Sequence, residues 1–369
     1  MPTAAFYVSG HGFGHASRQI EIINALTARL PDISVVIRTS AARWLFDRTL
    51  RRAERTLLIE GACDTGIIQI DSLRLDEAET IRRAAAFHAD LPGRAQTEAT
   101  LLHDHGVELV IADAPPLACA AAAAAGIPSI VAGNFTWDWI YAAYGDALAF
   151  APGLIPAISE AYMRAEAAWR LPMHGGFTAF ATIVDVPFVA RHARHEVEDT
   201  RRRLGLPLDA RLALSSFGGY GVNDFDLASL DCLDDWRVVV TGRAPLRDAP
   251  RGVCFVDEAH LYDSGLRYED LVRAVDVVVT KPGYGIISEC IANETAMLYT
   301  SRGHFAEYDV LVAELPRYVR CRYLDQQALL AGRWRAALEA LDAMPPPPER
   351  PPTNGADVVA VMIVERLQS

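Results

Sequence analysis

Short apolar runs rich in β-branched residues alternate with helical patterns along almost the whole chain, and this alternation restricts the possible folds more than any other feature. Continuous apolar strands that alternate with amphipathic helices are typical of parallel sheets with helices on both faces. In the first half, strands are expected at residues 5–9, 33–40, 66–70, 108–113, 129–133 and 182–188. In the second half, they are expected at residues 211–217, 237–242, 253–258, 275–281, 295–301 and 319–324. The sequence therefore predicts an α/β protein with two doubly wound, Rossmann-like parallel-sheet domains that face each other across a cleft.

The 369 residues are enough for two domains of ordinary size. We expect an N-terminal domain over residues 1–190 and a C-terminal domain over residues 191–344. A charged segment at 191–209 predicts a helix at the start of the second domain. The proline-rich run at 345–353 predicts a stiff linker. After it, the helix expected over 354–369 is long enough to pack back on the N-terminal domain.

The composition argues against several classes of protein. A formal net charge of −12 disfavours a general nucleic-acid binder and a protein that binds anionic membranes. The six cysteines form no C-x-x-C pair, so we expect neither a metal site nor a disulfide framework, and a reducing cytoplasm is the expected compartment. The N-terminus lacks the pattern of a signal peptide. The alanine-rich run at 117–128 is too short to span a membrane.

The segment KPGYGIISE, residues 281–289, predicts a phosphate site. It follows an expected strand, and a helix is expected from about residue 286, so free N–H groups at the helix start could bind a diphosphate. Lys281, the single lysine of the chain, could add a charge, and Glu289 on the first helical turn could accept hydrogen bonds from two ribose hydroxyls. Alternatively, this is an ordinary strand-to-helix turn in which Glu289 complements the helix dipole. The candidate residues are Lys281, Gly283, Tyr284, Gly285, Ser288 and Glu289.

Two further loops follow strands of the second half. Gly218 and Gly219 lie in SSFGGYG and could approach a phosphate from the other side, or they could only make a flexible loop. His304 and Glu307 lie in the charged loop at 300–311, where they could hold sugar hydroxyls or simply face solvent.

The segment GHGFGHASR, residues 10–18, opens the first expected helix. Its glycine spacing does not fit the G-x-G-x-x-G fingerprint of dinucleotide-binding folds. We therefore expect a histidine held on a tight turn at the cleft: His15 near the positive helix end, where the neutral, basic imidazole is favoured. Asp113, which ends the strand at 108–113, is the expected orienting carboxylate. Alternatively, His15 only packs or caps the helix, and His11 and Gly14 either line the acceptor pocket or only form the turn.

Aromatic residues gather after the strand at 129–133, in GNFTWDWIYAAYGD. Trp137 could stack on a sugar or line an acceptor pocket, and Asn134 and Asp138 are the polar candidates beside it. Alternatively, these aromatic side chains belong to the core beneath the cleft.

Five motifs carry a resemblance to a known family: YVSGHGFGHASR, CDTGIIQID, NFTWDWIYAAY, KPGYGIISE and LLAGRWRAALE. In this order they resemble the glycosyltransferase-like N-terminal region of plant L-arabinokinases and its stand-alone bacterial relatives, and the sugar-kinase module of the plant enzymes is expected to be absent. More distantly, GHGFGH with VIAD is similar to the histidine–aspartate pair of UDP-dependent glycosyltransferases of the GT-B superfamily. That resemblance implies that His15 deprotonates the acceptor and Asp113 balances its charge.

The resemblance extends to the donor loop. KPGYGIISE resembles the diphosphate loop and ribose glutamate of the same superfamily, which implies donor binding by Gly283, Gly285, Ser288 and Glu289. The His-Cys-Gly-Trp donor signature of the plant pattern is absent.

Together, motifs and resemblance predict an inverting, metal-independent glycosyltransferase with the GT-B architecture. Its N-terminal domain would bind a small-molecule acceptor and its C-terminal domain a nucleotide-diphosphate sugar, most simply a UDP-sugar, as co-substrate with no other cofactor. Two alternatives remain at this point: a non-catalytic nucleotide-sugar sensor or partner of a sugar kinase, and a nucleotide-sugar epimerase. The sequence does not specify the sugar, the acceptor or the oligomeric state.

Overall fold

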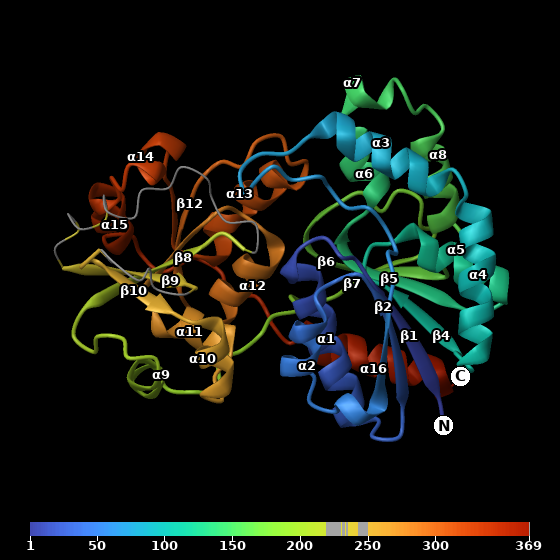
Figure 1. Ribbon diagram of the computed structural model, residues 1–369, viewed down its shortest axis with the longest axis horizontal. Helices are drawn as coiled ribbons and strands as arrows, with labels where there is room; N and C mark the ends of the chain where they lie inside the picture. The colour runs from blue at the N-terminus through green and yellow to red at the C-terminus, as the bar shows by residue number, and fades with distance from the viewer. Residues whose placement is uncertain (219–229, 231–232, 234, 243–249, 369) are drawn as a thin grey trace.

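The computed structural model describes residues 1–218, 230, 233, 235–242 and 250–368, and it contains two parallel sheets that lie side by side (Figure 1). The predicted site residue Gly219 lies outside the described residues. The two sheets, each with helices packed against it, confirm the predicted fold class.

The first sheet has seven parallel strands in the order β3-β2-β1-β4-β5-β6-β7. Their bounds are β1 Thr3–Val8, β2 Ser34–Thr39, β3 Thr56–Glu60, β4 Leu109–Ala112, β5 Ser129–Phe135, β6 Ala167–Gly175 and β7 Ile183–Asp185. The strand expected at 66–70 is wrong, because this segment makes only an isolated bridge between Gln69 and Leu75. The sequence analysis missed β3 and β6, since β3 lies at a half-exposed edge and β6 alternates buried with partly buried side chains.

The second sheet has six parallel strands in the order β10-β9-β8-β11-β12-β13. Their bounds are β8 Arg211–Ser216, β9 Trp236–Thr241, β10 Val253–Val256, β11 Val277–Thr280, β12 Ala296–Tyr299 and β13 Cys321–Tyr323. All six lie within or one residue from the expected segments. The central strand β11 is buried throughout, as its continuous valine run predicts.

The helices of the first sheet are α1 Phe13–Arg29, α2 Arg43–Thr49, α3 Glu77–His88, α4 Leu91–Asp104, α5 Pro116–Ala125, α6 Trp137–Ala142, α7 Gly145–Leu148 and α8 Leu154–Tyr162, with a 3-10 turn, η1, at Ala53–Arg55. Those that follow are α9 Val197–Arg203, α10 Glu258–Asp263, α11 Tyr268–Ala274, α12 Tyr284–Ala292, α13 Glu307–Tyr318, α14 Gln326–Leu330, α15 Arg335–Asp342 and α16 Gly355–Gln368. The charged helix expected over 191–209 is shorter in the structure. Residues 191–196 are not helical, and α9 covers only Val197–Arg203.

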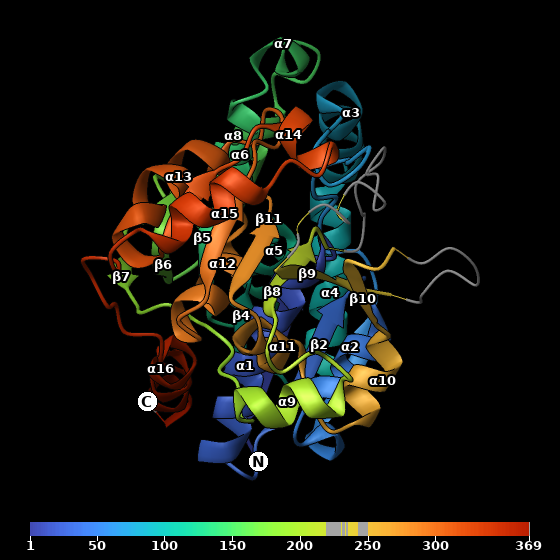
Figure 2. The same cartoon turned by 90° about the vertical axis from the view of Figure 1, so that its left-hand side faces the viewer.

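The last helix, α16, crosses back to the first sheet and packs against α1 (Figure 2). Its side chains Val359, Ala360 and Ile363 are fully buried in the apolar cluster that also contains Ile20 of α1. The chain therefore connects the sheets twice, through the segment between β7 and α9 and through the segment between α15 and α16. These two segments pair at the bridge between Val189 and Asn354.

The carboxyl ends of the strands of both sheets point toward the region between them. There α1, which follows β1, contacts α12, which follows β11 (Figure 1). The two helices come close at Gly14 and Gly285, where a side-chain carbon on Gly285 would be in van der Waals contact, at 3.4 Å, with the Cα of Gly14. The two helix N-termini thus meet at one place.

Candidate active site

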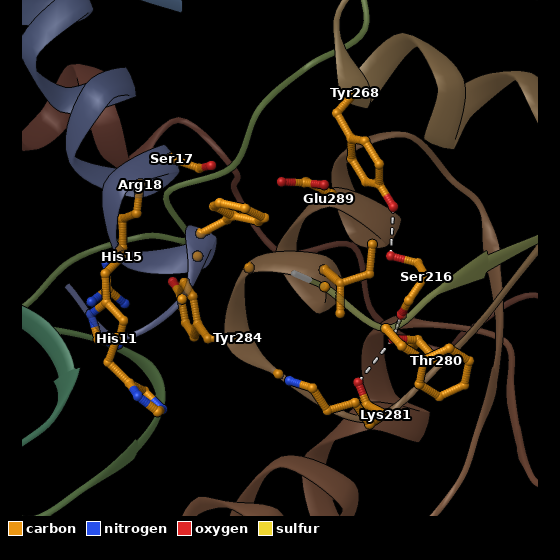
Figure 3. Close-up of a pocket in the computed structure, with 18 of the residues that line it drawn as sticks. His11, His15, Ser17, Arg18, Ser216, Tyr268, Thr280, Lys281, Tyr284 and Glu289 are labelled. Atoms are coloured by element: carbon orange, nitrogen blue, oxygen red, sulfur yellow. Dashed lines mark hydrogen bonds between the residues drawn. The ribbon is translucent and has the colours of Figure 1, made fainter. Parts of the chain in front are cut away.

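A cavity of about 480 Å³ lies between the two sheets, at the carboxyl ends of their strands (Figure 3). Most of the residues predicted from the sequence line it. They are His11, Gly14, His15, Asn134, Trp137, Gly218, Lys281, Gly283, Tyr284, Gly285, Glu289 and Glu307. In open parallel sheets this edge is where ligands bind.

His15 lies on the first turn of α1, two residues after the helix begins at Phe13. Gly12 precedes the helix with φ at +76°, a conformation that favours glycine, and this turn brings the imidazole to the cavity. The Nδ1 atom of His15 is hydrogen-bonded to Oδ2 of Asp113. The proton of a neutral imidazole is therefore held on Nδ1, and Nε2 keeps its lone pair.

Asp113 follows β4 directly, and its side chain is fully buried. Its other oxygen, Oδ1, accepts hydrogen bonds from Arg18 and, at 3.2 Å, from the amide of Gln19. Burial by itself would raise the pKa of Asp113, but the charge of Arg18 and the hydrogen bonds from His15 and Arg18 outweigh it and hold this pKa well below its ordinary value. Asp113 is therefore a permanent carboxylate at neutral pH.

Arg18 is a residue to which the sequence analysis gave no role. Its Nη1 atom donates to Oδ1 of Asn134 at 2.7 Å, and its guanidinium lies 5.2 Å from the centre of the Tyr284 ring at the start of α12. It therefore connects Asp113 and Asn134 with the second sheet. The signal was present in the sequence, because Arg18 follows His15 by three residues and so shares its helical face.

The N-terminus of α12 faces the cavity. The helix begins at Tyr284, two residues earlier than expected, because Gly283 is extended and ends the preceding turn. None of the described side chains caps this end and no acidic residue lies in the first turn, so its N–H groups can bind an anion. A side-chain carbon on Gly283 would lie 3.8 Å from Nζ of Lys281, which places that amine at the helix start.

The amine of Lys281 has an unusually low pKa. Burial and the neighbouring Arg302 lower the pKa of Lys281 to about 7. Arg302 is itself buried, donates to the carbonyl of Pro282 at 3.0 Å and pairs with Glu307 at 3.0 Å. An anion beside Lys281 would restore its charge.

Glu289 lies on the second turn of α12, and the expected position on the first turn is wrong because the helix begins earlier. The carboxylate is buried and accepts two hydrogen bonds from Arg191, one of them at 2.8 Å. Burial raises the pKa of Glu289, which the charge of Arg191 partly offsets. The sequence offered no signal for Arg191, because the contact depends on the path of the segment that joins the two sheets.

Apart from Asp113, which is hydrogen-bonded to His15 but does not itself line the cavity, three predicted residues among those described lie away from it. Ser288 donates its hydroxyl to the carbonyl of Gly285 at 2.8 Å, within its own helix. Asp138 accepts from Ser159 at 2.9 Å and from a neighbouring backbone N–H, and so holds α6 against α8. His304 is exposed and pairs with Glu77 across the two sheets at 2.9 Å. The roles expected for these side chains at the ligand therefore do not fit their positions.

His11 and Trp137 line the cavity but are tied to the first sheet. Nδ1 of His11 accepts from the backbone N–H of Ile67 at 3.3 Å, and burial lowers the pKa of His11 well below its ordinary value. The indole of Trp137 donates to Asp64 at 2.8 Å. Burial raises the pKa of Asp64 to about 6.

Nowhere in the described ranges do three or more His, Cys, Asp or Glu side chains converge as around a metal ion. No helix among the described residues is both long and apolar enough to cross a bilayer.

Comparison with known proteins identifies relatives of the fold and of the sequence. No family model matches the sequence. The chain is 29% identical over 367 residues to the L-arabinokinase of Arabidopsis thaliana, an alignment that covers 98% of this chain and 34% of that protein. The chain thus spans about a third of the length of this relative.

Solved glycosyltransferases share the architecture over the whole chain. The glycosyltransferase of kitacinnamycin matches with a TM-score of 0.64 at 17% identity, covering 99% of each chain. The calicheamicin glycosyltransferase CalG4 matches with 0.62 at 14% identity, covering 100% of this chain and 98% of that chain. Phytolacca americana UGT2, complexed with UDP-2fluoro-glucose and pterostilbene, matches with 0.59 at 12% identity, covering 100% and 94%. The chain therefore has the two-sheet GT-B fold of glycosyltransferases, and its sequence resembles that of a plant L-arabinokinase along almost its whole length.

Proposed function

We propose that the protein is an inverting glycosyltransferase that moves a sugar from a nucleotide-diphosphate sugar, most simply a UDP-sugar, to a hydroxyl group of a small-molecule acceptor. One observation carries the proposal: the hydrogen-bonded pair of His15 and Asp113 lies at the same cavity as the uncapped N-terminus of α12. A base and an anion site in one cavity are what this reaction requires.

His15 acts as the general base in this mechanism. Its Nε2 takes the proton of the acceptor hydroxyl while the acceptor oxygen attacks the anomeric carbon from the side opposite the diphosphate. The new C–O bond forms as the bond to the diphosphate oxygen breaks, so the configuration inverts and the electron pair leaves with the nucleoside diphosphate. Asp113 holds the imidazole in the productive tautomer and balances the charge that it gains.

The leaving diphosphate is stabilised from the second sheet. Its developing charge faces the N–H groups at the start of α12 and the amine of Lys281. These groups supply positive charge without a metal ion. The acceptor lies on the other side of the cavity, against Trp137 and Phe135, with the amide of Asn134 as a polar contact.

The test is a transfer assay with a panel of nucleotide sugars and acceptors, comparing the wild type with His15→Ala. We expect the loss of the base to reduce turnover by a factor on the order of 10² to 10⁴ while nucleotide binding is retained. His88→Ala, which removes an equally buried histidine outside the cavity, is the matched control. Unchanged turnover in His15→Ala removes His15 from the mechanism.

The same panel separates the alternatives. Tight nucleotide-sugar binding without turnover on any acceptor indicates a sensor. Conversion of the donor sugar with no acceptor present indicates an epimerase.

A further inference from the structure

Arg191 lies in the segment that joins the two sheets, between β7 and α9, and its side chain reaches into the cavity wall beneath Glu289. Its Nε and Nη2 atoms both donate to Oε1 of Glu289, the first at 2.8 Å. Its Nη1 atom lies 3.3 Å from Oε2 of Glu269, a second buried carboxylate, on α11. One arginine from the connecting segment therefore holds two acidic side chains of the second sheet.

The backbone of this arginine is also fixed. The side chain of Asn293, at the end of α12, donates to the carbonyl of Arg191 at 3.0 Å and accepts from the N–H of Ala193 at 2.8 Å. Because both the backbone and the guanidinium are anchored to α12, Arg191 holds the Glu289 carboxylate in one orientation.

This orientation leaves one oxygen of Glu289 available. Both hydrogen bonds from Arg191 go to Oε1, and Oε2 receives none from the residues that the structure describes. Glu289 lines the cavity, and Figure 3 shows its carboxylate on the same side as Tyr268 and Ser17, away from Lys281. An ionised carboxylate with a free oxygen, one helical turn from the expected diphosphate site at the start of α12, can accept hydrogen bonds from a vicinal pair of hydroxyls.

Several charged groups act on Glu289. Burial raises its pKa, the charge of Arg191 opposes that rise, and Glu269 and Glu21 add to it. Across α10 and α11 lie Tyr262, Tyr268 and Arg267, which act on the same cluster. Without Arg191, the buried carboxylates of Glu289 and Glu269 would repel each other, and protonation of one of them would become favourable.

We propose that Arg191 is a positioning residue that presents an ionised Glu289 to the ribose diol, and thereby makes the site selective for ribonucleoside over 2′-deoxyribonucleoside diphosphates. This inference rests on the nucleotide site of the proposed function. A site built to hydrogen-bond a substrate hydroxyl rejects the analogue that lacks it, because its own polar group is then left unpaired.

The experiment measures nucleotide affinity by calorimetry on the full chain. UDP, ADP and GDP identify the preferred base, and the tightest of them is compared with its 2′-deoxy form. In the wild type, we expect the deoxy form to bind about tenfold or more weakly, as for one hydrogen bond to a charged acceptor. In Arg191→Met, we expect this ratio to approach one, more completely at pH 6 than at pH 8, because the unopposed Glu289 takes up a proton. Arg191→Lys keeps the charge and retains part of the ratio.

A matched control separates positioning from structural support. Arg201→Met removes another buried arginine next to the second sheet, whose Nε donates to the carbonyl of Ala274 at 2.7 Å and which does not contact Glu289. It is expected to change the affinity for the two nucleotides equally and to leave their ratio unchanged.

Each result has a defined meaning. Equal loss of both nucleotides in Arg191→Met, at both pH values, overturns the positioning role, and so does a wild type that binds both forms equally or binds no nucleotide. A ratio that behaves as expected in a protein with no transfer activity sustains this inference and removes the proposed catalysis. Transfer activity without discrimination between the two nucleotides sustains the proposed catalysis and overturns this inference.

Discussion

Asp113→Asn tests the buried charge arrangement around His15 most directly. In the native structure this carboxylate has two hydrogen-bonded neighbours, the imidazole of His15 at one oxygen and the charged Arg18 at the other, and the side chain is fully buried. The substitution keeps the size of the side chain and removes its charge. Arg18, which is itself 6% exposed, then keeps a buried positive charge whose hydrogen-bonding neighbours among the described residues are the neutral Asn134 and the new amide.

The expected cost follows from that burial. Removing one partner of a buried ion pair costs about 3–5 kcal/mol, because the other charge remains without compensation. The pKa of Asp113 lies below its ordinary value, so its stabilising contribution is complete above the unfolded-state pKa of about 3.9 and is lost only as the pH falls through the still lower folded pKa. The penalty of Asp113→Asn is therefore expected to be the same from pH 5 to pH 8. Turnover is also expected to fall by a factor on the order of 10³ to 10⁴, since an amide can stabilise the other His15 tautomer.

The assay is the free energy of unfolding from urea denaturation, measured for a cycle of Asp113→Asn, Arg18→Met and the double variant. We expect the double variant to recover most of the stability lost in Asp113→Asn, because it removes both charges, but none of the activity. Additive losses in the double variant would falsify the argument that an uncompensated Arg18 causes the destabilisation.

Three further outcomes are expected. Lys281, with a pKa of about 7, is mostly charged only below that pH when the site is empty. The affinity for a nucleoside diphosphate should therefore fall by up to about tenfold per pH unit above pH 7, and Lys281→Met should flatten this dependence in calorimetry. Gly133→Ala should destabilise the protein by about 1–3 kcal/mol in urea denaturation, because the added carbon would lie 2.5 Å from the carbonyl oxygen of Asp113; an unchanged midpoint would contradict this. Asp64, whose pKa is raised to about 6, binds its proton more tightly in the folded state. Its contribution to stability should therefore fall by roughly 2.5 kcal/mol as the pH rises from 4 to 7, and thermal denaturation of Asp64→Asn should lack that slope.

Local sequence patterns account for many of the elements of this fold. The strands of the second sheet and, to within a few residues, the starts of α1 and α12 depend on local patterns: valine runs that can be buried on both faces, and glycines at turns. Such patterns act over a few residues, so the sequence predicts them. The pairing of His15 with Asp113 was predictable for a related reason, since neighbouring parallel strands bring their carboxyl ends to the same edge.

Local patterns were not sufficient at the edges of the first sheet. The run at 66–70 has the composition of a strand but lies outside the sheet, whereas β6 carries a proline and a histidine and is paired on both sides. Whether such a segment pairs depends on which neighbour is available, and that is a property of the assembled sheet.

The sequence by itself determined the α/β class, the two parallel sheets and the two glycine-bounded helix starts that could face a ligand. Only the tertiary structure decided which charged side chains are near the ligand and which are engaged elsewhere. It placed Arg191 on Glu289, 98 residues away along the chain, and directed His304 to Glu77 on the outside of the cavity. The physical reason is that a buried charge is stable only where an opposite charge reaches it, and for these residues the opposite charge comes from a distant segment whose path no local pattern specifies.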